Sequence, residues 1–148
     1  MITDKKILVI GSGVSGVGAV ELLEKAGASP ILYDSSEKLK EEEVRSRLPE
    51  GSRAEIILGT LPEEVKRETE LVILSPGVPV DLPLVEDMRR HGATIWGEVE
   101  LAWHFGKGKV AAVTGTNGKT TTTTLVGEIF KSWFPKVFVV GNIGTAYT

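Results

Sequence analysis

The stretch "ILVIGSGVSG", residues 7–16, decides the fold. It joins an apolar run to three glycines, Gly11, Gly13 and Gly16, which lie at the start of an expected helix. The run Ile7–Ile10 does not alternate between polar and apolar residues, which is typical of a strand buried on both faces of a parallel sheet. Six similar short runs follow: Ile31–Tyr33, Glu55–Leu58, Leu71–Leu74, Thr94–Trp96, Val110–Val113 and Val137–Val140.

Segments with helical spacing lie between these runs. Their apolar stripes are Val20, Leu23 and Ala26; Leu84, Val85 and Met88; and Leu125, Val126, Ile129, Phe130, Trp133 and Phe134. Helices are also expected in the charged segment Glu37–Leu48 and over Glu98–Trp103, and Gly27 and Gly92 are plausible helix ends. Strands that alternate with helices predict an α/β fold with right-handed crossovers.

A domain boundary is expected at "FGKGK", Phe105–Lys109, which follows about five predicted strands. After it come only a strand, a glycine-rich loop, a helix and one more strand. A single βαβ unit cannot bury both faces of its sheet. We therefore expect a complete domain over residues 1–106 and the incomplete beginning of a second domain over residues 107–148.

Composition excludes several classes of protein. The formal net charge of −3 gives no support to nucleic-acid binding. The absence of cysteine excludes disulfides and thiolate chemistry, and two histidines are too few for a histidine-rich metal site. The N-terminus does not read as a signal peptide and no apolar run approaches membrane-spanning length. A cytoplasmic protein without membrane insertion is the expectation.

The glycines of residues 11–16 allow a tight turn and let backbone approach a phosphate at the helix N-terminus. Asp34 ends the second predicted strand, where an acidic residue can accept from ribose hydroxyls. This pattern favours a nucleotide-type ligand, with NAD or FAD as the first hypothesis. Glycines that only pack a strand against a helix are the alternative.

A third loop, Ser75–Pro79, follows the strand Leu71–Leu74. Ligands of open parallel sheets bind beyond the carboxyl ends of the strands, so the three loops are expected along one edge. A plain turn is the alternative, because Ser-Pro-Gly forms turns readily.

The second glycine-rich stretch, "VTGTNGKTTTTTL", spans residues 113–125 and departs from the full Walker pattern at Val113. Gly115 and Gly118 let backbone N–H groups surround phosphate oxygens, Lys119 reaches the β- and γ-phosphates, and the Thr120 hydroxyl ligates magnesium. The β-branched threonines that follow are poor helix formers, which suggests hydroxyls facing the site or tight packing. A glycine turn with a solvated lysine is the alternative.

A further turn, "GNIG" over residues 141–144, follows the last predicted strand. Asn142 offers a donor and an acceptor there.

These motifs together resemble the Mur ligase family, ATP-dependent enzymes that add amino acids to the peptidoglycan precursor. The residues that carry the resemblance are "GSGVSG", "YDSS", "SPGVP", "GEVELA", "VTGTNGKTTTTTLVGE" and "VGNIG", in that order. The resemblance covers nearly all of the 148 residues. The phosphate loop is specific to the family, and the motifs before it point to the D-glutamate-adding branch.

The resemblance implies a Rossmann-like first domain that holds the UDP of a substrate rather than a dinucleotide. The implied UDP-substrate contacts are Gly13, Val14, Ser15, Asp34, Ser35, Ser36, Ser75, Pro76, Gly77 and Asn142. The implied ATP contacts are Gly115, Thr116, Asn117, Gly118, Lys119, Thr120 and Thr121, with Lys119 and Thr120 as the catalytic pair and Thr120 as the Mg²⁺ ligand. Family members often carry a basic residue where Ser36 stands.

The implied reaction joins UDP-N-acetylmuramoyl-L-alanine to D-glutamate with ATP and Mg²⁺, through an acyl phosphate, in a monomer when full length. The family's acidic magnesium ligand, carbamylated lysine and C-terminal domain would lie beyond residue 148, so the chain alone is expected to be inactive. The alternatives are a Mur ligase that adds L-alanine or a diamino acid, a nicotinamide-binding module, and a small regulatory nucleotide-binding protein.

Overall fold

The computed structural model describes residues 2–141 and 147–148. The chain forms two compact units, one made of Met1–Phe105 with Thr148 and the other of Gly106–Tyr147. In the part of the chain that is described, no helix is both long enough and apolar enough to cross a membrane. Each unit is treated by itself below.

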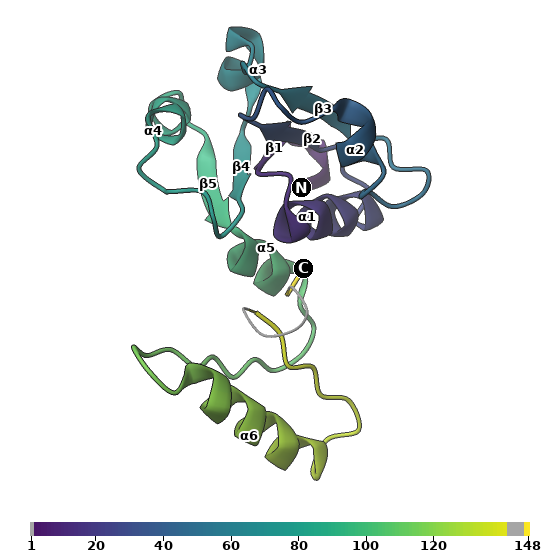
Figure 1. Ribbon diagram of the computed structural model, residues 1–148, viewed down its shortest axis with the longest axis vertical. Helices are drawn as coiled ribbons and strands as arrows, with labels where there is room; N and C mark the ends of the chain where they lie inside the picture. The colour runs from purple at the N-terminus through teal and green to yellow at the C-terminus, as the bar shows by residue number, and fades with distance from the viewer. Residues whose placement is uncertain (1, 142–146) are drawn as a thin grey trace. The chain divides into compact units, whose positions relative to one another are not determined.

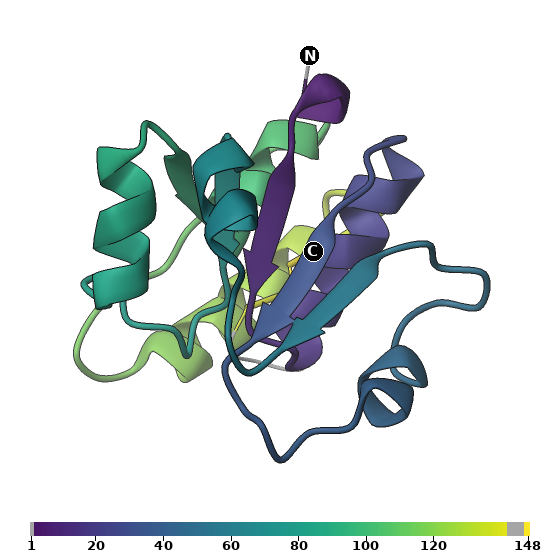
Figure 2. The ribbon, with the colours of Figure 1, turned by 90° about the horizontal axis from the view of Figure 1, so that it is seen from above.

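The first unit is built on a parallel five-stranded sheet in the order β3-β2-β1-β4-β5 (Figures 1 and 2). The strands are β1 Ile7–Ile10, β2 Ile31–Asp34, β3 Glu55–Leu58, β4 Leu71–Leu74 and β5 Thr94–Gly97. β1 is central and pairs with β2 on one side and β4 on the other. The α/β fold and the first five predicted strands are confirmed.

The sheet is covered on both faces, which explains the absence of polar alternation in the sequence. Successive residues of β1 point to opposite faces: Ile7 and Val9 pack in one buried cluster, Leu8 and Ile10 in the other. The first cluster contains side chains of α1, α2 and α5, and the second contains side chains of α4 and, at its margin, α3. All four β1 residues are buried as a result.

The helices of this unit are α1 Val14–Lys25, α2 Glu41–Arg45, α3 Glu63–Glu68, α4 Pro83–Arg90 and α5 Glu98–Phe105, preceded by the 3₁₀ turn η1 Ile2–Asp4. α2 is shorter than the predicted helix Glu37–Leu48. Within α2 only Val44 is buried, so there is little packing to extend it. α3 was not predicted. Gly27 and Gly92 follow α1 and α4 with positive φ, as expected of residues that end helices.

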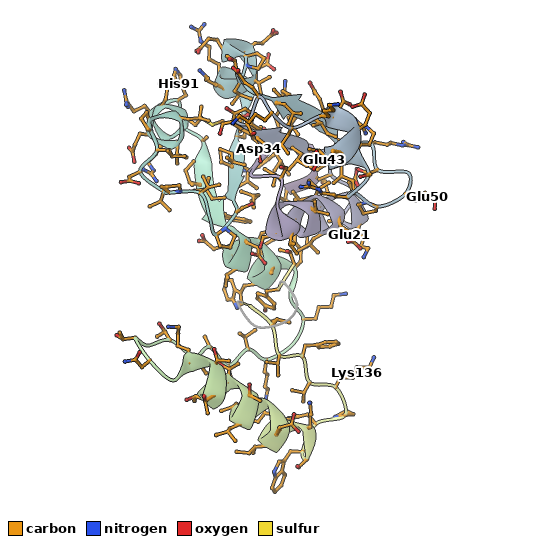
Figure 3. All side chains as sticks on the ribbon, in the orientation of Figure 1. Glu21, Asp34, Glu43, Glu50, His91 and Lys136 are labelled. Carbon is orange, nitrogen blue, oxygen red and sulfur yellow. The ribbon has the colours of Figure 1, made fainter. Side chains whose placement is uncertain are left out.

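Charged side chains of this unit pair along the outer faces of the helices. Glu21 pairs with Lys25 at 2.5 Å and Glu43 with Arg47 at 2.5 Å, each four residues apart. Figure 3 labels Glu21 and Glu43 among the side chains of this unit. Exposed pairs of this kind add little stability. The high charge content therefore reflects a solvated surface.

The described residues of the second unit form one helix, α6 Lys119–Lys131 (Figure 1). The prediction of strands at Val110–Val113 and Val137–Val140 is wrong. The described residues of this unit contain no strand, only an isolated β-bridge residue at Val140. A strand needs a hydrogen-bonded neighbour and a covered face, and Val110 is 53% and Phe138 81% exposed. The expected βαβ unit is present here only as its helix.

Candidate nucleotide-binding site

The glycine-rich turn connects β1 to α1 and is shaped by two of its three glycines. Gly11 has φ +102°, and its N–H donates to the Tyr33 carbonyl at 2.8 Å. A Cβ on Gly16 would lie 1.8 Å from the Gly11 carbonyl oxygen, so only glycine fits there. A Cβ on Gly13 would meet nothing within 4 Å. The backbone path of the turn therefore requires glycine at positions 11 and 16, whereas the space beside Gly13 is unfilled.

The first turn of α1 offers backbone N–H groups to a ligand. Gly13 is the N-cap of the helix, and no side chain caps it. Gly13 and Val14 are exposed and Ser15 is half-buried. The first N–H groups of an uncapped helix, together with the helix dipole, favour an anion such as a diphosphate.

Asp34, the last residue of β2, accepts hydrogen bonds from two loops. Its Oδ2 accepts from the Ser12 amide at 2.9 Å and from the Ser12 hydroxyl at 2.7 Å. Its Oδ1 accepts from the Ser36 amide at 3.0 Å. Partial burial by itself raises the pKa of Asp34, but the bonds from Ser12 and Ser36 and the charge of Arg47 outweigh it and lower the pKa below the usual value.

These bonds limit what the carboxylate can still accept. A carboxylate has about four lone-pair positions. Within the described part of the chain, Ser12 takes both positions on Oδ2 and Ser36 takes one on Oδ1. A ribose diol needs acceptors for two hydroxyls, whereas one position is left. The geometry does not favour the ribose contact expected of a dinucleotide site.

The third loop is tied to the first. The Ser75 N–H donates to the Ile10 carbonyl at 3.1 Å, and the Ser75 hydroxyl donates to the Gly11 carbonyl at 3.2 Å. Pro76 and Gly77 are exposed beyond it. The three loops thus meet at the carboxyl edge of β1, β2 and β4, as the sequence predicts.

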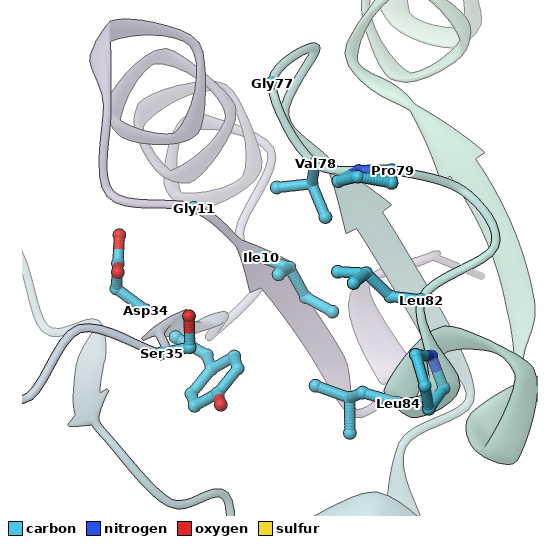
Figure 4. Close-up of a pocket in the computed structure, with 11 residues that line it drawn as sticks. Ile10, Gly11, Asp34, Ser35, Gly77, Val78, Pro79, Leu82 and Leu84 are labelled. Atoms are coloured by element: carbon cyan, nitrogen blue, oxygen red, sulfur yellow. The ribbon is translucent and has the colours of Figure 1, made fainter.

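A cavity of about 360 Å³ opens at this edge (Figure 4). Its lining residues are Ile10, Gly11, Tyr33, Asp34, Ser35, Gly77, Val78, Pro79, Leu82, Pro83 and Leu84. Apolar walls with a few polar groups at one side suit a flat ring with a polar edge. Burial and the nearby Asp34 charge raise the pKa of the Tyr33 phenol, which donates to the Gly59 carbonyl at 2.8 Å.

The cavity contains part of the predicted site. Asp34, Ser35 and Gly77 line it, whereas Ser75 and Pro76 line a separate cavity of about 390 Å³ with Trp96 and Glu98. Gly13, Val14, Ser15 and Ser36 line neither cavity. Asn142 lies outside the described residues.

Sequence reasoning missed the apolar wall and the buried serine of the glycine loop. Tyr33, Val78, Leu82 and Leu84 line the cavity. In the sequence they resemble ordinary core or turn residues, and only the proximity of Tyr33 to Asp34 could have indicated them. Ser12 is 2% exposed and stands between two glycines, where a polar side chain could have been noticed.

The phosphate-loop sequence of the second unit forms an exposed turn and helix start. Gly115 and Gly118 have φ of +151° and +74°, and Gly118 is the N-cap of α6. The Lys119 amine donates to the Gly115 carbonyl at 2.6 Å, which folds the side chain over the loop. Thr116, Asn117, Thr120 and Thr121 are exposed. The residues present fit phosphate through backbone N–H groups and the lysine.

The threonine run is accommodated in a way that the sequence did not indicate. The Thr123 hydroxyl donates to the Lys119 carbonyl at 2.8 Å, and the Thr124 hydroxyl donates to the Thr120 carbonyl at 2.9 Å. Hydroxyls bonded to the carbonyl one turn back have a partner inside the helix, but such bonds slightly destabilise a helix and do not offset the poor propensity of threonine. Among the described residues no group of three or more His, Cys, Asp or Glu side chains could hold a metal. The assignment of Thr120 as a Mg²⁺ ligand stays a prediction from the sequence.

A parallel sheet in this order, with a glycine-rich turn after its central strand and loops meeting at one edge, defines a Rossmann-like α/β domain. Residues 5–97 match the family model described as "Mur ligase MurD-like, N-terminal domain". The chain belongs to the Mur ligase family.

Several curated relatives named UDP-N-acetylmuramoylalanine--D-glutamate ligase are similar to it. The protein of Lachnoclostridium phytofermentans is 56% identical over 144 residues, which are 97% of this chain and 32% of that protein. That of Lachnospira eligens is 50% identical over 98% of this chain and 32% of its own length. The chain therefore spans about a third of the length of these relatives.

A solved structure supports the fold. A pseudomurein peptide ligase type C from Methanothermus fervidus aligns with a TM-score of 0.54 and 23% identity, over 86% of this chain and 26% of that chain.

Proposed function

We propose that this chain is the substrate-binding N-terminal part of an ATP-dependent ligase that adds D-glutamate to UDP-N-acetylmuramoyl-L-alanine in peptidoglycan synthesis. The observation that carries the proposal is the 56% identity to a protein of that name over 97% of the chain. The meeting of three loops at one sheet edge, beside a cavity of about 360 Å³, supports a substrate site in the first unit.

In this proposal the first unit holds the UDP moiety of the substrate. The N–H groups at Val14 and Ser15 bind the diphosphate at the start of α1, where the helix dipole favours negative charge. The cavity lined by Asp34, Ser35 and Gly77 takes the uridine. Ser36, Ser75 and Pro76 do not line this cavity and are proposed as further contacts from the same two loops. The apolar wall contributes by excluding water from the ring.

The second unit is assigned to the phosphates of ATP. Backbone N–H groups from Gly115 to Thr121 and the Lys119 amine neutralise phosphate charge, and Thr120 supplies one oxygen to Mg²⁺. The substrate carboxylate would attack the γ-phosphate and break its bond to the bridging oxygen, which gives an acyl phosphate and ADP. The D-glutamate amine would then attack the acyl carbon and release phosphate, with loss of a proton from the amine. Lys119 has to leave the Gly115 carbonyl to reach the phosphates.

We assign the whole protein to the cytoplasm and expect a monomer, with neither nucleic acid nor membrane as a partner. A ligase that adds L-alanine or a diamino acid is the weaker candidate, because the relatives quoted above carry the D-glutamate name. A nicotinamide-binding module is a still weaker candidate, because hydrogen bonds from Ser12 and Ser36 already take most acceptor positions of the Asp34 carboxylate that such a module would use for a ribose.

Calorimetric titration of this chain with UDP, UDP-N-acetylmuramoyl-L-alanine, NAD and ATP tests the substrate assignment. We expect weak binding of the two uridine compounds, little or no binding of ATP and none of NAD. Clear NAD affinity without a response to either uridine compound would contradict the proposal.

Lys119→Ala in the full-length ligase tests the assignment of the phosphate loop. Loss of a lysine that stabilises transferring phosphate is expected to reduce kcat by about a hundredfold or more. Lys136→Ala, at another exposed lysine of the same unit, is the matched control and is expected to leave kcat unchanged. Equal activity of the two variants would show that Lys119 is not the phosphate ligand.

A further inference from the structure

Ser12 is a buried polar residue inside the glycine-rich turn. It stands between Gly11 and Gly13 and is 2% exposed, and its hydroxyl and amide both donate to Asp34 Oδ2, at 2.7 Å and 2.9 Å. Gly11 and Gly16 shape the turn by themselves, as their φ and Cβ contacts show. The turn therefore does not need a hydroxyl at position 12 for its backbone path.

What the Ser12 hydroxyl adds is a connection between loops. Asp34 also accepts from the Ser36 amide, so one carboxylate joins the turn after β1 to the loop after β2. The Ser75 hydroxyl joins the loop after β4 to the same turn through the Gly11 carbonyl. All three loops that surround the expected ligand are thereby tied in series.

We propose that Ser12 is a positioning residue for the uridine compound: by binding the Asp34 carboxylate it holds the first two loops in their ligand-binding arrangement before the ligand arrives. This inference rests on the proposed function, because it takes a uridine diphosphate as the ligand. Ser12 does not line the cavity, whereas Asp34 and Ser35 do, so it acts through Asp34.

The physical basis is pre-organisation. Hydrogen bonds to a charged acceptor are stronger than those between neutral groups. The bonds from Ser12 and Ser36 orient the Asp34 carboxylate and help to lower its pKa. Without the hydroxyl, the loop after β2 has more freedom in the free protein, and the ligand must order it on binding. Ser12 also takes both acceptor positions on Asp34 Oδ2, so only Oδ1 has a position left for a ligand hydroxyl.

The test compares Ser12→Ala with Ser52→Ala in this chain. The Ser52 hydroxyl donates to Glu24 Oε1 at 3.0 Å, so the control removes the same kind of serine–carboxylate bond away from the three loops. Calorimetric titration with UDP is expected to show about three- to tenfold weaker binding for Ser12→Ala, the range set by ordering a loop side chain or two. Ser52→Ala is expected to bind as the wild type does.

A second readout separates positioning from general stability. Ser12→Ala removes a bond that lowers the pKa of Asp34, so NMR titration of the Asp34 carboxyl is expected to show a higher pKa, and the Ser36 amide is expected to exchange faster. Asp34→Asn is the second variant, and adding Ser12→Ala to it is expected to weaken UDP binding no further, because the two residues act as one unit.

The outcomes are distinguishable. Unchanged UDP affinity in Ser12→Ala, or equal losses in Ser12→Ala and Ser52→Ala, would overturn the inference, as would strictly additive losses in the double variant. Absence of UDP binding by the wild type would count against the proposed function instead. In that case, an unchanged Asp34 pKa and Ser36 exchange rate in Ser12→Ala would still overturn the positioning role. If Ser12→Ala does not fold, Asp34→Asn alone replaces the double-variant test. Unchanged UDP affinity together with an unchanged exchange rate of the Ser36 amide in Asp34→Asn would then overturn the inference.

Discussion

α1 and α6 each have a glycine as N-cap, but they lie in different surroundings. Each follows a glycine-rich turn, and they have 12 and 13 residues. α1 buries Gly16, Ala19, Val20 and Leu23 against the sheet, whereas α6 buries only Gly127 and leaves Leu125 and Ile129 each 59% exposed. The same local signal thus gives a packed helix in one unit and an apolar, exposed helix in the other.

The difference teaches that in a strand–loop–helix sequence the helix forms from local signals alone. The strand forms only where neighbouring strands and helices pack against it. β1 has a hydrogen-bonded strand on each side and helices on both faces. Residues 110–113 and 137–140, with equally apolar sequences, are mostly exposed or half-buried and form no ladder in the described part of the second unit. Burial against a partner, and not β-propensity, separates them.

Hydrogen exchange should show the largest contrast. Amides of β1 open only with global unfolding, whereas those of α6 have little packing to protect them. We expect protection in β1 to exceed that in α6 by about a thousandfold or more. The measurement is amide exchange by NMR or mass spectrometry on this chain. Uniform protection along the chain would show that both units unfold as one.

Replacing one leucine in each helix compares the two helices by their contribution to the free energy of unfolding. Leu23→Ala in α1 removes a fully buried side chain and is expected to lower the free energy of unfolding by about 2–5 kcal/mol. Leu125→Ala in α6, where the side chain is 59% exposed, is expected to change it by about 0.5 kcal/mol or less. Urea denaturation followed by circular dichroism measures both. Equal effects would mean that the α6 face is covered in solution.

A glycine pair tests the site turn. Gly16→Ala places a Cβ within 1.8 Å of the Gly11 carbonyl oxygen, and the backbone must move, at about 2–3 kcal/mol. Gly13→Ala meets nothing within 4 Å and is expected to change stability by about 1 kcal/mol or less. Thermal melts and UDP titration of both variants are the measurement. A Gly16→Ala variant as stable as the wild type would contradict the close packing of turn and helix.

Acidification gives the smallest expected effect. Because folding lowers the pKa of Asp34, its contribution to stability is complete above its ordinary value of 3.8 and is lost as the pH falls through the lowered value. The stability difference between the wild type and Asp34→Asn should therefore be constant at neutral pH and shrink below pH 3.8. Urea denaturation at a series of pH values measures it. A stability difference that grows on acidification would show that folding raises the pKa of Asp34 instead of lowering it.

The first unit could be predicted from its sequence more fully than the second. The runs from Ile7 to Trp96 formed strands because each pairs with at least one other run of the same kind. The run Val110–Val113 looked the same and did not form one. Within the site, Asp34 and the three loops were predictable from strand ends, while Tyr33, Leu82 and Leu84 were not, because apolar residues carry no sign of whether they face a core or a cavity.

The sequence by itself determined the five strands of the first unit, the glycines of both turns and the family, because these depend on local spacing and on residue identity. Only the tertiary structure decided that β1 is central, that Ser12 reaches Asp34 and that Ser75 reaches Gly11. Ser12 and Asp34 are separated by 22 residues and Ser75 and Gly11 by 64. Contacts over such separations exist only when parallel strands have paired and brought their carboxyl ends to one edge.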